Sequence, residues 1–196
     1  MTNISIIVEG EEDIRFLQDF VQLHFNQKLD KDIFINIEGK TEKFSLSTIK
    51  IQSSTIGKGN KNILIFDADD KNFTSTLQKI KAKASDLNLT FDSIFLFPDN
   101  KSKGNLETLL LSCVNKKNKE LLKCIRAYSE CKSALKLDLS REIDEKEEFY
   151  IYHGSFEKSG RSKGTERSYL IEHIWDLKAE ETNSLKDFLS TVLDIN

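Results

Sequence analysis

The sequence predicts an α/β fold: an open, mainly parallel four-stranded sheet flanked by helices, followed by a C-terminal, mostly helical extension. Short segments rich in β-branched or aromatic residues indicate strands at about residues 3–8, 32–38, 62–67 and 93–97. Stretches with helical spacing of apolar residues alternate with the strands, which is typical of parallel strands joined by right-handed crossovers. A chain of 196 residues with 38% hydrophobic content can bury the core of such a domain.

Apolar periodicity predicts the helices between the strands, at about residues 11–27, 44–51 and 73–87. Gly10 provides the tight turn before the first of them. Acidic residues occupy the first turn of that helix, where the helix dipole favours negative charge.

After residue 104 the pattern becomes mainly helical, with helices expected at about residues 106–114, 119–135 and 184–193. The charged stretch 138–148 reads as a solvated loop, residues 149–152 as a short strand, and residues 154–168 as a mobile loop. We therefore expect a core at residues 1–110 and a helical extension at residues 111–196, packed together as one unit.

Charge and cysteine content limit the class of protein. The formal net charge is −3, so any contact with nucleic acid must be local, metal-assisted or aided by a partner. Cys113, Cys124 and Cys131 are odd in number and lack metal-ligand spacing, which favours reduced thiols at core positions on helices. The sequence starts without a signal-peptide pattern and has no run of membrane-spanning length, so we expect a cytoplasmic protein.

Two predicted strands end in carboxylates. The strand at 62–67 runs into Asp67, Asp69 and Asp70, and the strand at 3–8 runs into Glu9. Ligands of open α/β sheets bind beyond the carboxyl ends of the strands, so these side chains are expected to converge there. Clustered carboxylates repel one another, and a hard divalent cation relieves that repulsion. We therefore predict that Glu9, Asp67 and Asp69 bind Mg²⁺ or Mn²⁺.

Structural roles compete with functional ones at neighbouring residues. Glu11 and Glu12 are interpreted as helix-start charges only, and Asp13 is open to either interpretation. Asp70 could cap the following helix rather than bind metal.

Further polar residues receive structural interpretations. Asp99-Asn100 is expected to make the turn after Pro98. The basic residues of the 158–167 loop favour a solvated loop over a phosphate-binding one. The histidines are far apart, without ligand spacing, and are expected to pack or to lie at the surface: His24, His153 and His173.

Glu9-Gly10 after one strand and Asp67-Ala68-Asp69 after another resemble the Toprim domain, over residues 3 to about 110. That domain is shared by type IA and type II topoisomerases, bacterial primases, small maturation nucleases and the overcoming-lysogenization-defect nucleases. Gly39 falls where many Toprim proteins carry a glycine. The whole chain resembles the DUF3226 family through IVEGEEDIRFL, ILIFDADD, FLFPDN, GNLETLL, the Cys124-to-Cys131 helix and WDL before LKDFL.

The resemblance to the nuclease branch implies that Asp13 and Glu107 complete a second metal position. Two metals can activate a water and stabilise the leaving oxygen in phosphodiester cleavage. A cation would offset charge in the transition state. Lys103 is the residue predicted for that role, with Lys71 and Lys101 as alternatives.

The sequence thus favours a metal-dependent nuclease, or a related phosphotransfer enzyme, acting on DNA or RNA through Glu9, Asp67, Asp69 and Lys103. The alternative is a non-catalytic Toprim-like subunit that binds nucleic acid or regulates a partner such as an ATPase. Topoisomerases and primases need further domains that this length does not hold. The substrate, the oligomeric state and the role of residues 111–196 are not predicted.

Overall fold

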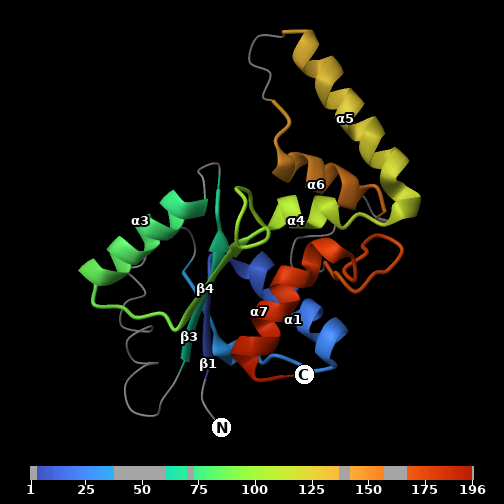
Figure 1. Cartoon of the computed structure of the whole chain (residues 1–196). Helices are drawn as coiled ribbons and strands as arrows, with labels where there is room; N and C mark the ends of the chain where they lie inside the picture. The colour runs from blue at the N-terminus through green and yellow to red at the C-terminus, as the bar shows by residue number, and fades with distance from the viewer. Residues whose placement is uncertain (1–3, 38–60, 70–72, 137–141, 157–166, 196) are drawn as a thin grey trace.

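The computed structural model describes residues 4–37, 61–69, 73–136, 142–156 and 167–195 (Figure 1). Its centre is a sheet of four parallel strands in the order β2-β1-β3-β4. The strands are β1 (Ile4–Val8), β2 (Phe34–Asn36), β3 (Lys61–Asp67) and β4 (Ser93–Phe97). This architecture confirms the predicted open, parallel α/β sheet.

The order of the strands reverses at β1. Val8 pairs with Asn36 of β2 on one side and with Ile65 of β3 on the other. The chain therefore continues from β1 to one side and later returns to the opposite side. Ligands of open α/β sheets bind in a crevice at such a reversal, beyond the carboxyl ends of the two diverging strands, so the expected crevice of this sheet lies beyond β1 and β3.

The apolar run of β3 explains its central position. Ile63, Leu64 and Ile65 have no exposed surface, because helices cover both faces of the sheet. Polar residues stand only toward the ends of the strand, at Lys61, Asn62 and Asp67. A strand buried on both faces must end where its sequence becomes polar. For β3 that point is Asp67.

The helices are α1 (Glu11–Phe25), α3 (Phe73–Asp86), α4 (Leu106–Ser112), α5 (Lys119–Ala134), α6 (Glu145–Gly154) and α7 (Asn183–Leu193). Figure 1 shows α3 on one face of the sheet and α1 with α7 on the other. Short 3-10 turns lie at Lys31–Ile33, Lys116–Asn118 and Glu180–Thr182. Helices α4, α5 and α6 lie beyond the carboxyl ends of the strands, and α5 is the outermost of them.

The face of the sheet under α1 and α7 holds the larger hydrophobic cluster, which extends into α4, α5 and α6. Phe95 of β4 packs against Phe188 of α7, with ring centroids 5.1 Å apart. Trp175 stacks on Phe149 of α6 at 5.7 Å. One apolar cluster therefore joins the sheet to the helices that cover its carboxyl end.

The strand predicted at residues 149–152 is wrong, because these residues belong to α6. The Asp144 side chain accepts a hydrogen bond from the Glu147 N–H at 2.8 Å and so caps the helix. Phe149, Tyr152 and His153 form its buried side with helical spacing. The charged residues before Phe149, read as a solvated loop, are in part the acidic first turn of this helix.

Other predictions need smaller corrections or remain open. Strand β2 is shorter than predicted, because residues 31–33 form a 3-10 turn. Cys113 is buried as expected, whereas Cys124 and Cys131 are exposed on α5, so their predicted core positions are wrong. The predicted helix at 44–51, Gly39 and most of the 154–168 loop lie outside the described residues.

Among the described helices, none combines the length and apolar character that crossing a membrane requires.

Candidate carboxylate site

Strands β1 and β3 bring Glu9 and Asp67 together at the crevice. The Asp67 N–H donates a hydrogen bond to Glu9 Oε1 at 3.2 Å. The Leu106 N–H, at the start of α4, donates to Asp67 Oδ1 at 3.0 Å. Asp67 therefore links the end of the central strand to the first residue of a helix beyond the sheet.

Asp13 approaches the same crevice from α1. Its Oδ2 accepts a hydrogen bond from the Gly10 N–H at 2.9 Å, which fixes the turn between β1 and the helix. Burial raises the pKa of Asp13 to about 7, and the negative charges of Glu107 and Glu12 contribute to the rise. Asp13 thus has a structural role in the turn and also faces a second carboxylate.

Glu107 completes the group from α4, where its side chain is buried. Burial raises the pKa of Asp67 well above its usual range, and the charges of Glu9, Asp13 and Glu107 raise it further. Four carboxylates from separate parts of the chain therefore influence one another in a region with little water.

Backbone contacts fix Asp69 at the end of β3. Its backbone lies in the left-handed region at φ 62° and forms an antiparallel bridge with Gly104, with N···O distances of 2.8 and 3.0 Å. Gly104 itself has φ 134°, and a Cβ there would lie 2.7 Å from Thr108 Oγ1, so only glycine fits. The bridge ties the end of β3 to the loop before α4. Asp70 and Lys71 lie outside the described residues.

Carboxylate oxygens are the hard donors that Mg²⁺ and Mn²⁺ prefer. Within the described ranges, no three or more His, Cys, Asp or Glu side chains are positioned as a group that could hold a metal ion. The carboxylate oxygens are nevertheless donors of the type that a divalent cation takes. The residues that could hold one are Glu9, Asp13, Asp67 and Glu107, with Asp69 as the further ligand that the sequence predicts.

Lys146 of α6 is a cation beside Glu107 that the sequence did not predict at the site. Its Nζ lies 3.7 Å from Glu107 Oε1, and its side chain is 61% exposed. Partial burial lowers the pKa of Lys146, but the charges of Glu107, Asp67 and Asp13 outweigh this effect and raise it. The predicted Lys103 is instead exposed in the loop before Gly104.

A capping signal could have revealed Lys146. Asp144 followed three residues later by Glu147 is a helix-start pattern, and it would have identified residues 145–154 as helical. Lys146 would then have been placed in the first turn of a helix. The apolar composition of residues 149–152 favoured a strand and hid this signal.

Glu12 is more than a helix-start charge. It accepts hydrogen bonds from Tyr169 Oη, from Arg15 Nη2 at 2.7 Å and from Arg167 Nη1 at 3.1 Å. The Arg167 side chain is only 9% exposed, so the solvated interpretation of the 158–167 loop is wrong for this residue. Glu12 therefore anchors residues 167–169 beside the start of α1. Glu11 is exposed and meets Lys31 and Asn36 at 3.3 Å.

The structural interpretation of Asp99 is confirmed. Its Oδ1 accepts from the N–H groups of Lys101 and Ser102, at 3.0 and 2.7 Å, and so closes the turn after Pro98. The histidines also follow the prediction. His24 is partly buried against the Leu177 carbonyl, His153 is buried in the core and His173 is exposed.

These features define an open, parallel α/β protein with partly buried, mutually interacting carboxylates where the strand order reverses. Within that class, the chain belongs to the DUF3226 family, described as a protein of unknown function, whose profile matches residues 3–194. Comparison with curated proteins and with solved structures gave no match.

Proposed function

We propose that this protein is a Mg²⁺- or Mn²⁺-dependent nuclease that cleaves phosphodiester bonds of DNA or RNA at the carboxylate cluster. The observation that supports the proposal is the hydrogen bond from the Asp67 N–H to Glu9 Oε1 at the reversal point of the sheet, together with a pKa of Asp67 that is raised by burial and by the charges of Glu9, Asp13 and Glu107. The Toprim-like pattern of Glu9-Gly10 and Asp67-Ala68-Asp69 supports the same reaction class.

The residues of the chain have distinct roles in this proposal. Bound divalent ions would activate a water molecule and neutralise charge on the leaving oxygen. Glu9 and Asp67 orient the site, because the hydrogen bond between them fixes the Glu9 carboxylate against the end of β3. Lys146 is a further candidate, besides Lys103, for offsetting charge in the transition state, since its exposed ammonium lies beside Glu107 and can meet a substrate phosphate.

A second candidate is a non-catalytic subunit that binds nucleic acid or regulates a partner such as an ATPase. The net charge of −3 favours it, because a protein that binds nucleic acid without assistance is usually basic. The hydrogen bond from the Leu106 N–H to Asp67 also gives that carboxylate a structural use. Both candidates are proposed for the cytoplasm, where the three free thiols would remain reduced.

Cleavage assays on single-stranded and double-stranded DNA and RNA, with Mn²⁺ or Mg²⁺, separate the two candidates. We expect wild-type protein to cut at least one substrate and Asp67→Asn to lose that activity. The amide of asparagine has a single, neutral oxygen, so it offers no anionic oxygen to a metal. Glu130→Gln, an exposed change on α5, is the matched control and should cut normally. Equal cleavage, or none, by wild-type protein and Asp67→Asn on every substrate would contradict the nuclease and favour the binding subunit.

A further inference from the structure

Helix α6 presents an exposed aromatic ring close to the carboxylate cluster. Tyr150 is 40% exposed, whereas its neighbours Phe149 and Tyr152 are buried. Tyr150 lies four residues after Lys146, so the two side chains share one face of the helix, with Cβ atoms about 5–6 Å apart. Lys146 Nζ lies 3.7 Å from Glu107 Oε1, so the Tyr150 ring stands one helical turn from the lysine that contacts the carboxylates.

The Tyr150 ring is held in position by its surroundings. The Arg167 guanidinium lies over it, 4.5 Å from the ring centroid. Arg167 is itself fixed by Glu12, at 3.1 Å. The Phe149 ring meets Tyr150 edge to face, with centroids 5.4 Å apart. A ring fixed in this way loses little side-chain entropy when a ligand stacks on its exposed part.

Charge around this ring suits an anionic ligand with a planar end. Lys146 lies one helical turn before Tyr150 and is largely exposed, and the Arg167 guanidinium, held by Glu12, lies over the ring. Aromatic rings beside basic side chains are the combination that binds unpaired nucleic acid, because bases stack on the ring and phosphates meet the cations. A nucleotide carries both groups and can span one helical turn.

We propose that Tyr150 is a stacking platform for an unpaired nucleobase next to the phosphate that the carboxylate site cleaves. This inference rests on the proposed nuclease function and names its substrate as single-stranded or frayed nucleic acid. In an intact duplex both faces of each base are already stacked, so the ring finds no free base. Lys146 contacts the adjoining phosphate.

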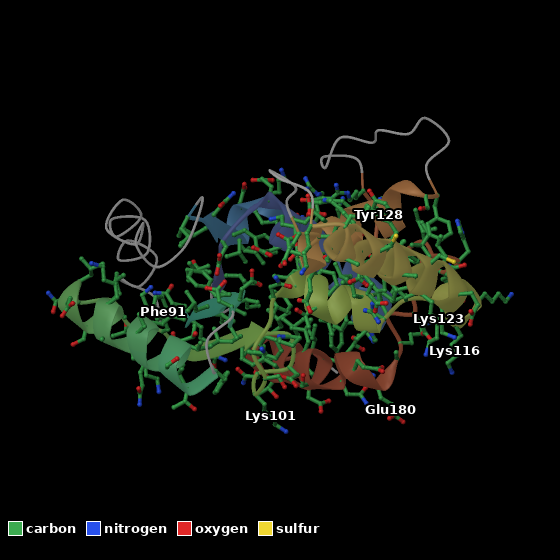
Figure 2. The ribbon with its side chains drawn as sticks, turned by 90° about the horizontal axis from the view of Figure 1, so that it is seen from above. Phe91, Lys101, Lys116, Lys123, Tyr128 and Glu180 are labelled. Carbon is green, nitrogen blue, oxygen red and sulfur yellow. The ribbon has the colours of Figure 1, made fainter. Side chains whose placement is uncertain are left out.

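Tyr128 provides a matched comparison. It is 58% exposed, more than Tyr150, and lies on α5, the outermost helix (Figures 1 and 2). If exposure alone made a tyrosine bind bases, Tyr128 would bind them better than Tyr150. The proposal instead assigns binding to the ring beside the carboxylates.

The test measures binding apart from cleavage. Fluorescence anisotropy with labelled oligonucleotides of about ten nucleotides is recorded in Ca²⁺, for single-stranded DNA and RNA, a matching duplex, and a single strand whose central residues are abasic. Wild-type protein should bind a normal single strand roughly tenfold or more tightly than the abasic one. Tyr150→Ala should lose this difference, and Tyr150→Phe and Tyr128→Ala should keep it.

The outcomes separate this proposal from the nuclease itself. Equal binding of normal and abasic strands by wild-type protein, or an undiminished difference in Tyr150→Ala, overturns the platform. The comparison with the abasic strand needs no variant, so equal binding by wild-type protein rejects the platform even if Tyr150→Ala fails to fold. Base-dependent binding that requires Tyr150, without any cleavage in Mn²⁺, supports the platform and rejects the nuclease. Cleavage by wild-type protein without base-dependent binding rejects the platform alone.

Discussion

At the scale of single residues, Asp67 has two opposed roles. Its Oδ1 accepts a hydrogen bond from the Leu106 N–H, which stabilises the start of α4. Its charge is nevertheless unfavourable, because burial raises its pKa and the charges of Glu9, Asp13 and Glu107 raise it further. An aspartate with a purely structural role would accept the hydrogen bond from the Leu106 N–H without a charge that its surroundings make unfavourable.

This conflict predicts that Asp67→Asn stabilises the metal-free protein. The amide oxygen can still accept from the Leu106 N–H, and the repulsion disappears. Near pH 8 with a chelator, we expect a gain of about 1 kcal/mol or more, which corresponds to a melting temperature higher by roughly 2–4 °C. Mn²⁺ should stabilise wild-type protein and have little effect on the variant.

Thermal unfolding with EDTA and with MnCl₂ checks both halves of this prediction. Glu130→Gln is the control and should follow wild-type protein in both buffers. A variant less stable than wild-type protein without metal would show that Asp67 is retained for stability. A Mn²⁺ effect as large in Asp67→Asn as in wild-type protein would count against its role as a ligand.

His24 predicts a dependence of stability on pH. Burial lowers its pKa, and the charges of Lys178 and Lys186 add to this effect, although the bond to the Leu177 carbonyl opposes it. As pH falls below the ordinary histidine pKa of about 6.5, the unfolded chain takes up a proton before the folded one. The stability that neutral His24 provides is therefore complete above that pH and is lost as pH falls through the lower folded pKa.

The measurement is the free energy of unfolding in urea between about pH 7.5 and pH 5. His24→Gln removes the titrating group and can still donate to the Leu177 carbonyl, so its stability should fall less steeply toward acid than that of wild-type protein. His173→Gln, at an exposed position, should keep the wild-type slope. Identical slopes for His24→Gln and wild-type protein would exclude this contribution.

At the scale of elements, local sequence signals predicted the strands better than they predicted helix α6. Strand β3 and its terminal Asp67 follow from one apolar run that stops at a carboxylate. Helix α6 was missed because its capping residue and acidic first turn precede an apolar segment that is also typical of a strand. The roles of Lys146 and Glu12 depend on contacts between distant segments, such as Glu12 with Arg167, 155 positions away, which no local pattern contains.

The anchor at Glu12 joins α1 to the segment before Trp175. Glu12→Gln leaves Arg15 and Arg167 without their shared carboxylate, so we expect a loss of about 1–3 kcal/mol in the free energy of unfolding. Urea denaturation measures it. Glu11→Gln is the adjacent control: its carboxylate is exposed, and the change should stay within about 0.5 kcal/mol. Equal losses in the two variants would show that Glu12 is not an anchor.

At the scale of the whole molecule, the sheet and the helices beyond it share one apolar cluster. That cluster contains β1 and β4 residues together with Trp175 and the buried side of α7. Separate cores would let helices α5 and α6 move independently of the sheet. A shared core instead packs α6, which carries Lys146 and Tyr150, against the sheet that carries Glu9 and Asp67, and the proposed cleavage site needs such fixed positions.

The shared cluster predicts that residues 1–110 and 111–196 unfold together. Trp175 is the only tryptophan, so its fluorescence reports on the extension, whereas far-ultraviolet circular dichroism reports on all helices and strands. The two signals should give coincident transitions in urea, as expected for one cooperative unit. Phe188→Ala removes a partly buried ring that packs on Phe95 of the sheet, and it should lower both midpoints by the same amount, at a cost of about 1–3 kcal/mol. A fluorescence transition at a lower urea concentration than the dichroism transition would mean that the extension unfolds first. Helices α5 and α6 could then separate from the carboxylates while the sheet stayed folded.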